Sequence, residues 1–301
     1  MGGNIVKTRA ATRITIIGLA TNLLLASLKF SVGFVGHSQA VIADAVHSLS
    51  DLATDVILLI GIRYWALPPD ECHPYGHRRI ETLIAGVIGA VLAFVAINLM
   101  YKAVITLVKG IAVANVEIIA LIGPGISIVL KECLYRATAK VGRDIGSSAI
   151  IANAFHHRSD ALSSIPALVA VILASMDARL IYFDSVGSIV VSILILKSAL
   201  EIIRPNIREL VDGIDSAFKC NDWIKAEVMT IEGVQGVHGI RTRTHGGLLL
   251  IDLHILVDPN LTIRQGHDIA EKVKQTLLQR DQKVVDVMVH VEPYEKSSSS
   301  S

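Results

Sequence analysis

The stretch LIAGVIGAVLAFVAINLMY, residues 83–101, contains no charged side chain. A helix that crosses the hydrocarbon core of a bilayer needs about 20 predominantly apolar residues. This stretch therefore predicts a transmembrane helix, which we extend to residues 80–108. The whole chain agrees with that interpretation, because 52% of its 301 residues are hydrophobic and only 18% are charged, against ~25% in soluble domains.

Similar apolar stretches on both sides of this one predict six transmembrane helices in all. Two of them precede it, at about 13–35 and 38–66, and three follow it, at about 112–136, 148–176 and 180–204. In the fourth, Gly123-Pro124-Gly125 predicts a kink.

Beyond Arg204 the apolar residues fall into the shorter periods of a soluble domain. We expect helices at Ala217–Ile231 and Thr262–Arg280, and strands at Val237–Arg243, Leu248–Val257 and Val284–Val291. The order αββαβ predicts a compact, ferredoxin-like α+β domain. The predicted division is a cytoplasmic segment (1–12), a six-helix transmembrane domain (13–208), a cytoplasmic α+β domain (209–294) and a disordered tail or tag remnant (295–301).

Basic residues predict the orientation of these spans. Under the positive-inside rule, the loops that carry most Lys and Arg are cytoplasmic. One side holds Lys7, Arg9, Arg13, Arg63, Arg78, Arg79, Arg136, Lys140, Arg143, Arg204 and Arg208, and the other holds little beyond Lys109 and Arg179. We therefore expect a multi-pass protein of the cytoplasmic (inner) membrane with both termini inside. The net charge of +1 and the absence of a recognised motif give no indication of a nucleic-acid partner.

Two of the predicted spans carry a His and an Asp four positions apart. His47 and Asp51 lie in the second span, and His156 and Asp160 lie in the fifth. Residues with this spacing share one face of a helix, and each ionisable group at the membrane centre costs a few kcal/mol without a partner. If the two pairs face each other, they supply two imidazole nitrogens and two carboxylate oxygens, a tetrahedral set that suits Zn2+.

Other interpretations of these pairs are weaker. A single pair in a soluble helix is usually an ordinary surface contact, and a proton relay would need no metal, but two pairs in apolar spans favour metal binding. An intramembrane metallohydrolase would need an open coordination position and a base, as in His-Glu-x-x-His, which the sequence lacks, so we do not expect an enzyme. Asp44 shares the face roughly, and we expect it to support a ligand from outside the coordination sphere.

At these residues, and in the loop from Asp70 to Glu81 with its His-Pro-Tyr-Gly-His segment (73–77), the sequence resembles the cation diffusion facilitator family and is zinc-exporter-like. The resemblance covers nearly the whole chain. It implies a homodimer that exports Zn2+ or a similar ion in exchange for protons by alternating access. It also assigns the two pairs to the transport site. A His at position 47 is the version associated with Zn2+ and Cd2+, whereas all-Asp or Asn/Asp versions are associated with Mn2+.

The resemblance implies further sites outside the spans. Asp70, His73 and His77 match an inner-loop zinc site, and Arg79 and Asp212 match an ion pair between the membrane helices and the cytoplasmic domain. Cytoplasmic metal ligands are expected at His238, His254, His267, His290 and Glu292, although the family usually has Asp in place of this Glu. His245 matches no ligand position, and we expect it at the surface. Two alternatives stay open: export of Fe2+, Co2+, Ni2+ or Cd2+, and a non-transporting metal sensor or scaffold.

Overall fold

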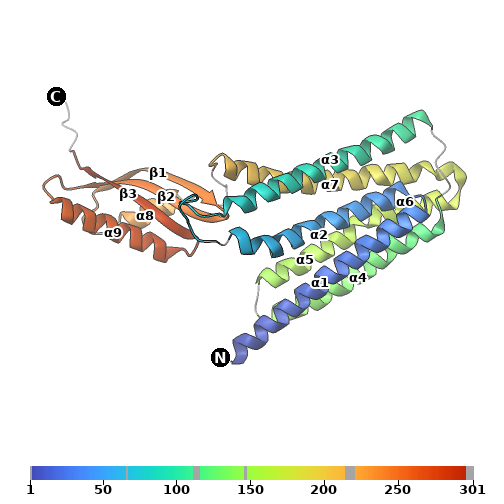
Figure 1. Ribbon diagram of the computed structural model, residues 1–301, viewed down its shortest axis with the longest axis horizontal. Helices are drawn as coiled ribbons and strands as arrows, with labels where there is room; N and C mark the ends of the chain where they lie inside the picture. Colours follow the sequence, from blue (N-terminus) through green and yellow to red (C-terminus); the bar gives the residue numbers. More distant parts are fainter. Residues whose placement is uncertain (1, 66, 111–115, 146–147, 214–220, 296–301) are drawn as a thin grey trace. The chain divides into compact units, whose positions relative to one another are not determined.

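The computed structural model describes residues 2–65, 67–110, 116–145, 148–213 and 221–295 (Figure 1). The chain forms two compact units, one of Met1–Ile62 with Val87–Ile202 and the other of Arg63–Gly86 with Ile203–Ser301. Residues 296–301 of the expected tail and residues 217–220 of the expected helix lie outside the described residues.

Long helices make up the N-terminal two thirds of the chain. They are α1 (Gly2–Val35), α2 (Gln39–Trp65), α3 (Arg79–Lys109), α4 (Ile122–Ile145), α5 (Ser148–Ser163), α6 (Ile165–Met176) and α7 (Tyr182–Leu210). Two short 3-10 helices, η1 (Ile118–Leu121) and η2 (Ala178–Leu180), precede α4 and α7.

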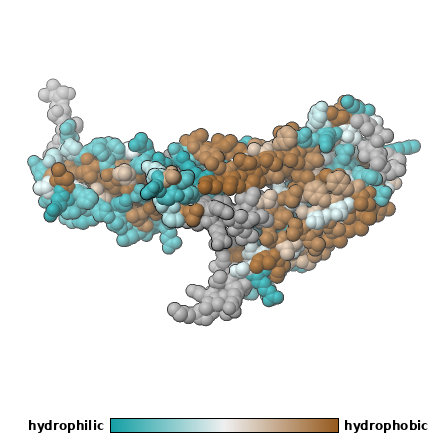
Figure 2. Space-filling view, viewed as in Figure 1, coloured by the Kyte–Doolittle hydropathy of each residue, from teal (hydrophilic) through white to brown (hydrophobic). Residues whose placement is uncertain are grey.

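In the described part of the chain, five helical stretches are long and apolar enough to cross a membrane. These are Thr12–Val35, Arg79–Lys109, Ile118–Asp144, Ile150–Met176 and Tyr182–Leu210. The remaining expected span, 38–66, corresponds to α2, whose side chains are described only as far as residue 53. Apolar side chains cover much of the visible surface of these helices (Figure 2), as expected of surfaces that face lipid.

Two local features of the spans differ from expectation. The predicted kink at Gly123-Pro124-Gly125 is wrong, because α4 begins at Ile122 and Pro124 lies in its first turn. A proline there breaks no helical hydrogen bond, since the first N–H groups of a helix have no intrahelical acceptor. The predicted fifth span is interrupted instead: α5 ends at Ser163 and α6 begins at Ile165, with Pro166 near its start.

Small residues allow the membrane helices to approach closely. Ala40 of α2, Ala96 of α3 and Ala170 of α6 belong to one buried cluster, and a Cβ on Gly187 of α7 would collide with the Cβ of Ala170. Interfaces between helices in lipid are enriched in such residues, because packing rather than the hydrophobic effect drives their association. α4 packs along both α1 and α5, which brings residues from three spans together.

The C-terminal domain has the order α8 (Asn221–Val228), β1 (Gly236–His245), β2 (Leu248–Val257), α9 (Ile263–Arg280) and β3 (Val284–Pro293). The sheet order is β1-β2-β3, with β1 antiparallel and β3 parallel to β2. Leu253 and Ile255 of β2 pack in one core with Val273 and Leu277 of α9, whereas His254 between them is only partly buried. The predicted fold class, a helical membrane domain followed by an α+β domain, is confirmed, and the protein is a multi-pass membrane protein.

Candidate metal sites

Three of the four residues expected at the transport site lie together. Asp51 of α2 and His156 and Asp160 of α5 each offer a ligand atom within 4.8 Å of the others. The His156 Nδ1 atom lies 3.7 Å from the Asp160 Oδ1 atom, because a spacing of four residues puts both side chains on one face of α5. Two carboxylates and an imidazole so close together form a cluster that can hold a divalent cation.

His47, the fourth expected residue, is buried one helical turn before Asp51. Within the described part of the chain it lies outside the group of three, and its Nδ1 atom is buried without a hydrogen-bond partner. The Oδ2 atom of Asp51 is likewise buried and unpartnered. Buried polar atoms are nearly always paired in native proteins, so these two atoms fit positions that a bound ion would satisfy.

Lys131 of α4 also reaches this cluster, although the sequence did not lead us to expect it. Its Nζ atom donates a hydrogen bond of 2.7 Å to the Asp160 Oδ2 atom, and both side chains are almost fully buried. The signal that could have found it is the charge itself, because an ionisable residue inside an apolar span needs a partner there. The pairing with Asp160 follows from the packing of α4 along α5.

Asp44 is held by a second buried lysine. The Lys29 Nζ atom of α1 lies 2.9 Å from the Asp44 Oδ2 atom, and it also donates to the hydroxyls of Ser48 and Ser164. The Ser164 hydroxyl in turn donates to the Asp44 Oδ1 atom over 3.0 Å. Ser164 is the residue at the break between α5 and α6, so this polar network ties α1 and α2 together at that break.

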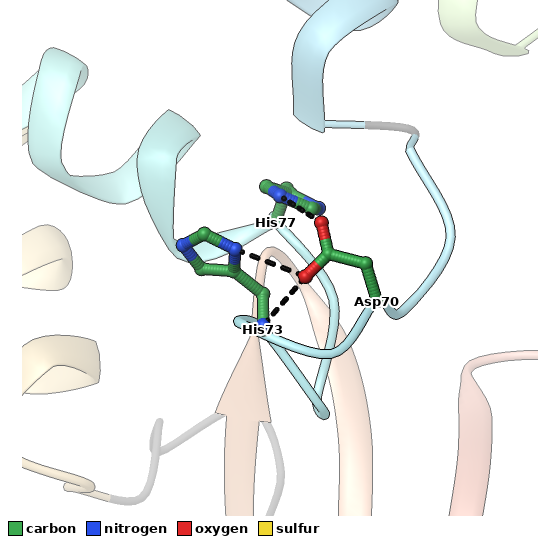
Figure 3. Close-up of side chains that lie close together, drawn as sticks. All are labelled: Asp70, His73 and His77. Carbon is green, nitrogen blue, oxygen red and sulfur yellow. Dashed lines mark hydrogen bonds and ion pairs between the residues drawn. The ribbon is translucent and has the colours of Figure 1, made fainter.

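In the loop that precedes α3, the carboxylate of Asp70 lies between two imidazoles (Figure 3). Its Oδ1 atom is 3.2 Å from His73 Nδ1, and its Oδ2 atom is 3.3 Å from His77 Nε2. The backbone N–H of His73 donates to the same carboxylate over 2.6 Å and lowers the pKa of Asp70 below its usual value. The three residues predicted for the inner-loop site therefore form a second cluster of the kind that holds a metal.

A third cluster crosses the sheet of the C-terminal domain. The strand register aligns His238, His254 and His290 in one row across β1, β2 and β3. The Glu292 Oε2 atom is 2.9 Å from His238 Nε2, and its Oε1 atom is 2.7 Å from His254 Nδ1 and 3.6 Å from His290 Nε2. The hydrogen bond with His254 is the largest cause that lowers the pKa of Glu292.

A bulge in β1 helps to set this row. The register shifts between His238 and Arg241, where Gly239 has a φ of 60°. A Cβ at this position would lie 3.2 Å from the ring of His254, so glycine suits both the backbone and the space. His267, which the sequence also suggested as a ligand, is exposed on α9 and is outside the clusters found among the described residues.

Two residues outside the metal clusters complete the predicted set. Arg79 forms an ion pair with Asp212, in the turn that follows α7, and both side chains are substantially exposed. Glu209 accepts hydrogen bonds from the hydroxyl of Thr82 and from the backbone N–H of Gly246. The surface position expected for His245 is wrong, because its side chain is half-buried and its burial lowers the pKa of the imidazole.

Comparison with known proteins gives matches over nearly the whole chain. A family model described as the cation efflux transmembrane domain matches residues 15–211, and one described as the cation efflux protein cytoplasmic domain matches residues 221–294.

Among similar proteins, the manganese efflux system protein MneP of Bacillus subtilis is 34% identical and is covered over 98% of its length, with 96% of this chain. The magnetosome protein MamB of Paramagnetospirillum magneticum is 30% identical, with 90% of each chain covered. Among solved structures, a nickel form of a MamM CTD is 28% identical, with a TM-score of 0.24, over 25% of this chain and 94% of that one.

Proposed function

Since this chain belongs to the cation efflux, or cation diffusion facilitator, family of metal transporters, which are not enzymes, we propose that it exports Zn2+ in exchange for protons. The observation that carries this proposal is the convergence of Asp51, His156 and Asp160 inside the helical domain. Ionisable groups at membrane depth line ion pathways when they are not structural pairs. His47, whose buried Nδ1 atom has no hydrogen-bond partner, is the fourth ligand of the proposed quartet.

The chemistry of the quartet suits alternation between metal and protons. A metal ligand must be a neutral imidazole or an ionised carboxylate, so protons compete with the ion for each of these groups. Imidazole has a reference pKa of ~6.5, which makes metal release responsive to ordinary pH gradients. In the proposed cycle the metal binds from the cytoplasm, protons displace it on the opposite side, and an inward proton gradient drives the exchange.

Mn2+ is the second candidate ion, because the relative MneP is named as a manganese efflux protein. Imidazole nitrogens favour Zn2+ over Mn2+, whereas carboxylates are the common ligands of Mn2+. The proposed quartet has two ligands of each kind, so its composition suits either Zn2+ or Mn2+. Fe2+, Co2+, Ni2+ and Cd2+ accept the same ligands.

We assign the other two clusters to metal ions that regulate or stabilise a homodimer. The inner-loop cluster of Asp70, His73 and His77 offers two imidazoles and a carboxylate at the surface, and the row across the sheet adds a second set. Metal binding at such sites contributes folding free energy, so occupancy would stiffen the C-terminal domain. The pairing of two copies is supported by the match to the family's cytoplasmic domain.

The test is metal flux in proteoliposomes that contain the wild-type chain. A pH gradient is imposed, and uptake of Zn2+ and Mn2+ is followed separately with a trapped metal indicator. The proposal predicts Zn2+ uptake that depends on the gradient and is accompanied by proton movement in the opposite direction. Faster flux of Mn2+ than of Zn2+ would make Mn2+ the transported ion and overturn the assignment of Zn2+. Metal binding without flux of any ion would support a non-transporting sensor or scaffold instead.

A further inference from the structure

We propose that Lys131 is a tethered cation that neutralises Asp160 when the transport site is empty, weakens metal binding and speeds the return of the empty transporter. This inference rests on the proposed transport function, since it assigns Lys131 a role at that site. It concerns a residue of α4, whereas the proposed ligands lie on α2 and α5.

The two oxygens of Asp160 have different neighbours. The Lys131 Nζ atom donates a hydrogen bond of 2.7 Å to the Oδ2 atom, and the Oδ1 atom lies 3.7 Å from the His156 Nδ1 atom. Only 2% of the Lys131 side chain and 7% of the Asp160 side chain are exposed. The ammonium of Lys131 therefore competes with the metal for Asp160, because it is hydrogen-bonded to a carboxylate that is also a proposed metal ligand.

The net charge of the site changes sign with occupancy. When both carboxylates are ionised and the imidazoles are neutral, Asp51 and Asp160 contribute two negative charges and Lys131 one positive charge, so the empty site carries a net charge of −1. A bound divalent ion brings the total to +1 if Lys131 keeps its place. Like charges repel strongly in a medium of low dielectric constant, so the ammonium either lowers the affinity where it stands or moves away at a cost.

Lysine suits this role because its ammonium is a compact charge on a flexible four-carbon chain. The other buried lysine provides a contrast within the same unit. Lys29 is fixed by Asp44, Ser48 and Ser164, and none of these belongs to the group of three ligands. The partners of Lys29 thus lie outside the proposed metal site, whereas the partner of Lys131, Asp160, is itself a proposed metal ligand.

A purely orienting role for Lys131 makes the opposite prediction. If the lysine only held Asp160 in position, its removal would weaken metal binding. If it competes with the metal, its removal tightens binding and slows turnover, because the empty site is then left with two buried carboxylates and no fixed cation. The direction of the change in Kd therefore separates the two roles.

The test compares Lys131→Gln, which retains a hydrogen-bond donor but removes the charge, with Lys131→Arg, which retains the charge. Lys197→Gln is the matched control, because Lys197 is exposed on α7 and pairs only with Glu201 in the described structure. The full chain is titrated with Zn2+ in detergent at fixed pH. The site of interest is the one whose signal disappears in Asp51→Ala, and flux kinetics are measured in parallel.

We expect Lys131→Gln to lower the Kd of this site at least tenfold, which corresponds to ~1.4 kcal/mol, and to reduce the maximal flux. Lys131→Arg, which keeps the charge, should lower the Kd less than Lys131→Gln does, and the control Lys197→Gln should stay within about threefold of the wild-type Kd. If Lys131→Gln is unstable without metal, it is purified with Zn2+ and its affinity is measured by competition with a chelator. An unchanged or weaker affinity would overturn the inference.

Failure of the proposed function would look different. In that case the wild-type chain itself would show no Zn2+ signal that depends on Asp51, and no flux. A wild type that binds and transports, together with a Lys131→Gln variant of equal or weaker affinity, would contradict only the role given to Lys131.

Discussion

The Nζ atom of Lys29 lies 2.9 Å from the Oδ2 atom of Asp44, and both side chains are fully buried. Removing one partner of such a pair leaves an uncompensated charge, at a cost of ~3–5 kcal/mol. We therefore expect Lys29→Met to lower the thermal unfolding temperature of the purified chain markedly. The double variant Lys29→Met/Asp44→Asn should recover much of this loss, since no net charge remains unpaired. Equal losses in the single and double variants would contradict the structural role of the pair.

The ion pair between Arg79 and Asp212 should contribute little stability by itself. The two side chains are 39% and 49% exposed, and exposed pairs are worth ~0–1 kcal/mol. A double-mutant cycle with Arg79→Ala and Asp212→Ala is expected to give a coupling energy below about 1 kcal/mol. Because Asp212 has a φ of 55°, Asp212→Gly should be better tolerated than Asp212→Ala. The measurement is thermal unfolding of the four members of the cycle and of the glycine variant, and a larger coupling energy would contradict this account.

Glu292 joins the row of histidines across the sheet, so its loss should weaken metal binding there. The carboxylate approaches His238 and His254 at 2.9 and 2.7 Å. We expect Glu292→Gln to reduce the affinity of the full chain for Zn2+ at this cluster by roughly 10- to 100-fold, the range seen when supporting groups of metal sites are lost. His267→Ala is the comparison, and its effect should be smaller because that imidazole is exposed outside the cluster. Equal effects would place His267 among the ligands.

Above pH 4.5, Glu292 should contribute nothing to the pH dependence of metal binding at this cluster. The pKa of Glu292 is lowered in the folded protein, chiefly by His254. The stability that its ionised form contributes is therefore complete above its unfolded value near 4.5 and is lost only as the pH falls through the lower folded value. Protons also compete with the metal for an imidazole ligand, because only the neutral ring binds the ion.

We therefore expect Zn2+ affinity at the cluster to fall as the pH is lowered, because protons compete with the metal for its ligands. The slope should be the same in wild type and Glu292→Gln at every pH above the ordinary carboxyl value of 4.5, because the Glu292 carboxylate is already ionised there. Isothermal titrations at several pH values measure both slopes. A flattened slope in Glu292→Gln would show that the carboxylate titrates in this range, contrary to its lowered pKa.

The hydropathy of the chain and the periodic spacing of its apolar residues were enough to predict most of the fold. Charge-free stretches located the membrane helices, and alternation located β2 at Leu248–Val257, the bounds that the structure has. The kink at Pro124 was mispredicted because the start of α4 depends on how η1 ends, which the period of apolar residues does not record. The break at Ser164 was missed because residues 161–176 carry no charge and therefore predicted one span, although Pro166 is a sequence signal for the start of a new helix.

The candidate ligands were predictable to the extent that they share one element. The pair His156 and Asp160 follows from helical spacing alone. Asp70, His73 and His77 lie in one short loop, and the family resemblance pointed to them. Contacts between elements were not predictable in the same way. Lys131 meets Asp160 because α4 lies along α5, and the histidine row requires a strand register that is shifted by the bulge at Gly239.

The central claim is that Asp51 and Asp160 bind the ion that is transported. The most direct measurement is the initial rate of Zn2+ uptake into proteoliposomes under an imposed pH gradient, for wild type, Asp51→Asn and Asp160→Asn. Asp144→Asn is the matched control, since Asp144 is exposed near the end of α4. The account predicts that both site variants lose at least about 100-fold in rate, equivalent to ~2.7 kcal/mol, while the control keeps the wild-type rate. Undiminished uptake by either site variant, reconstituted in equal amount, would contradict it.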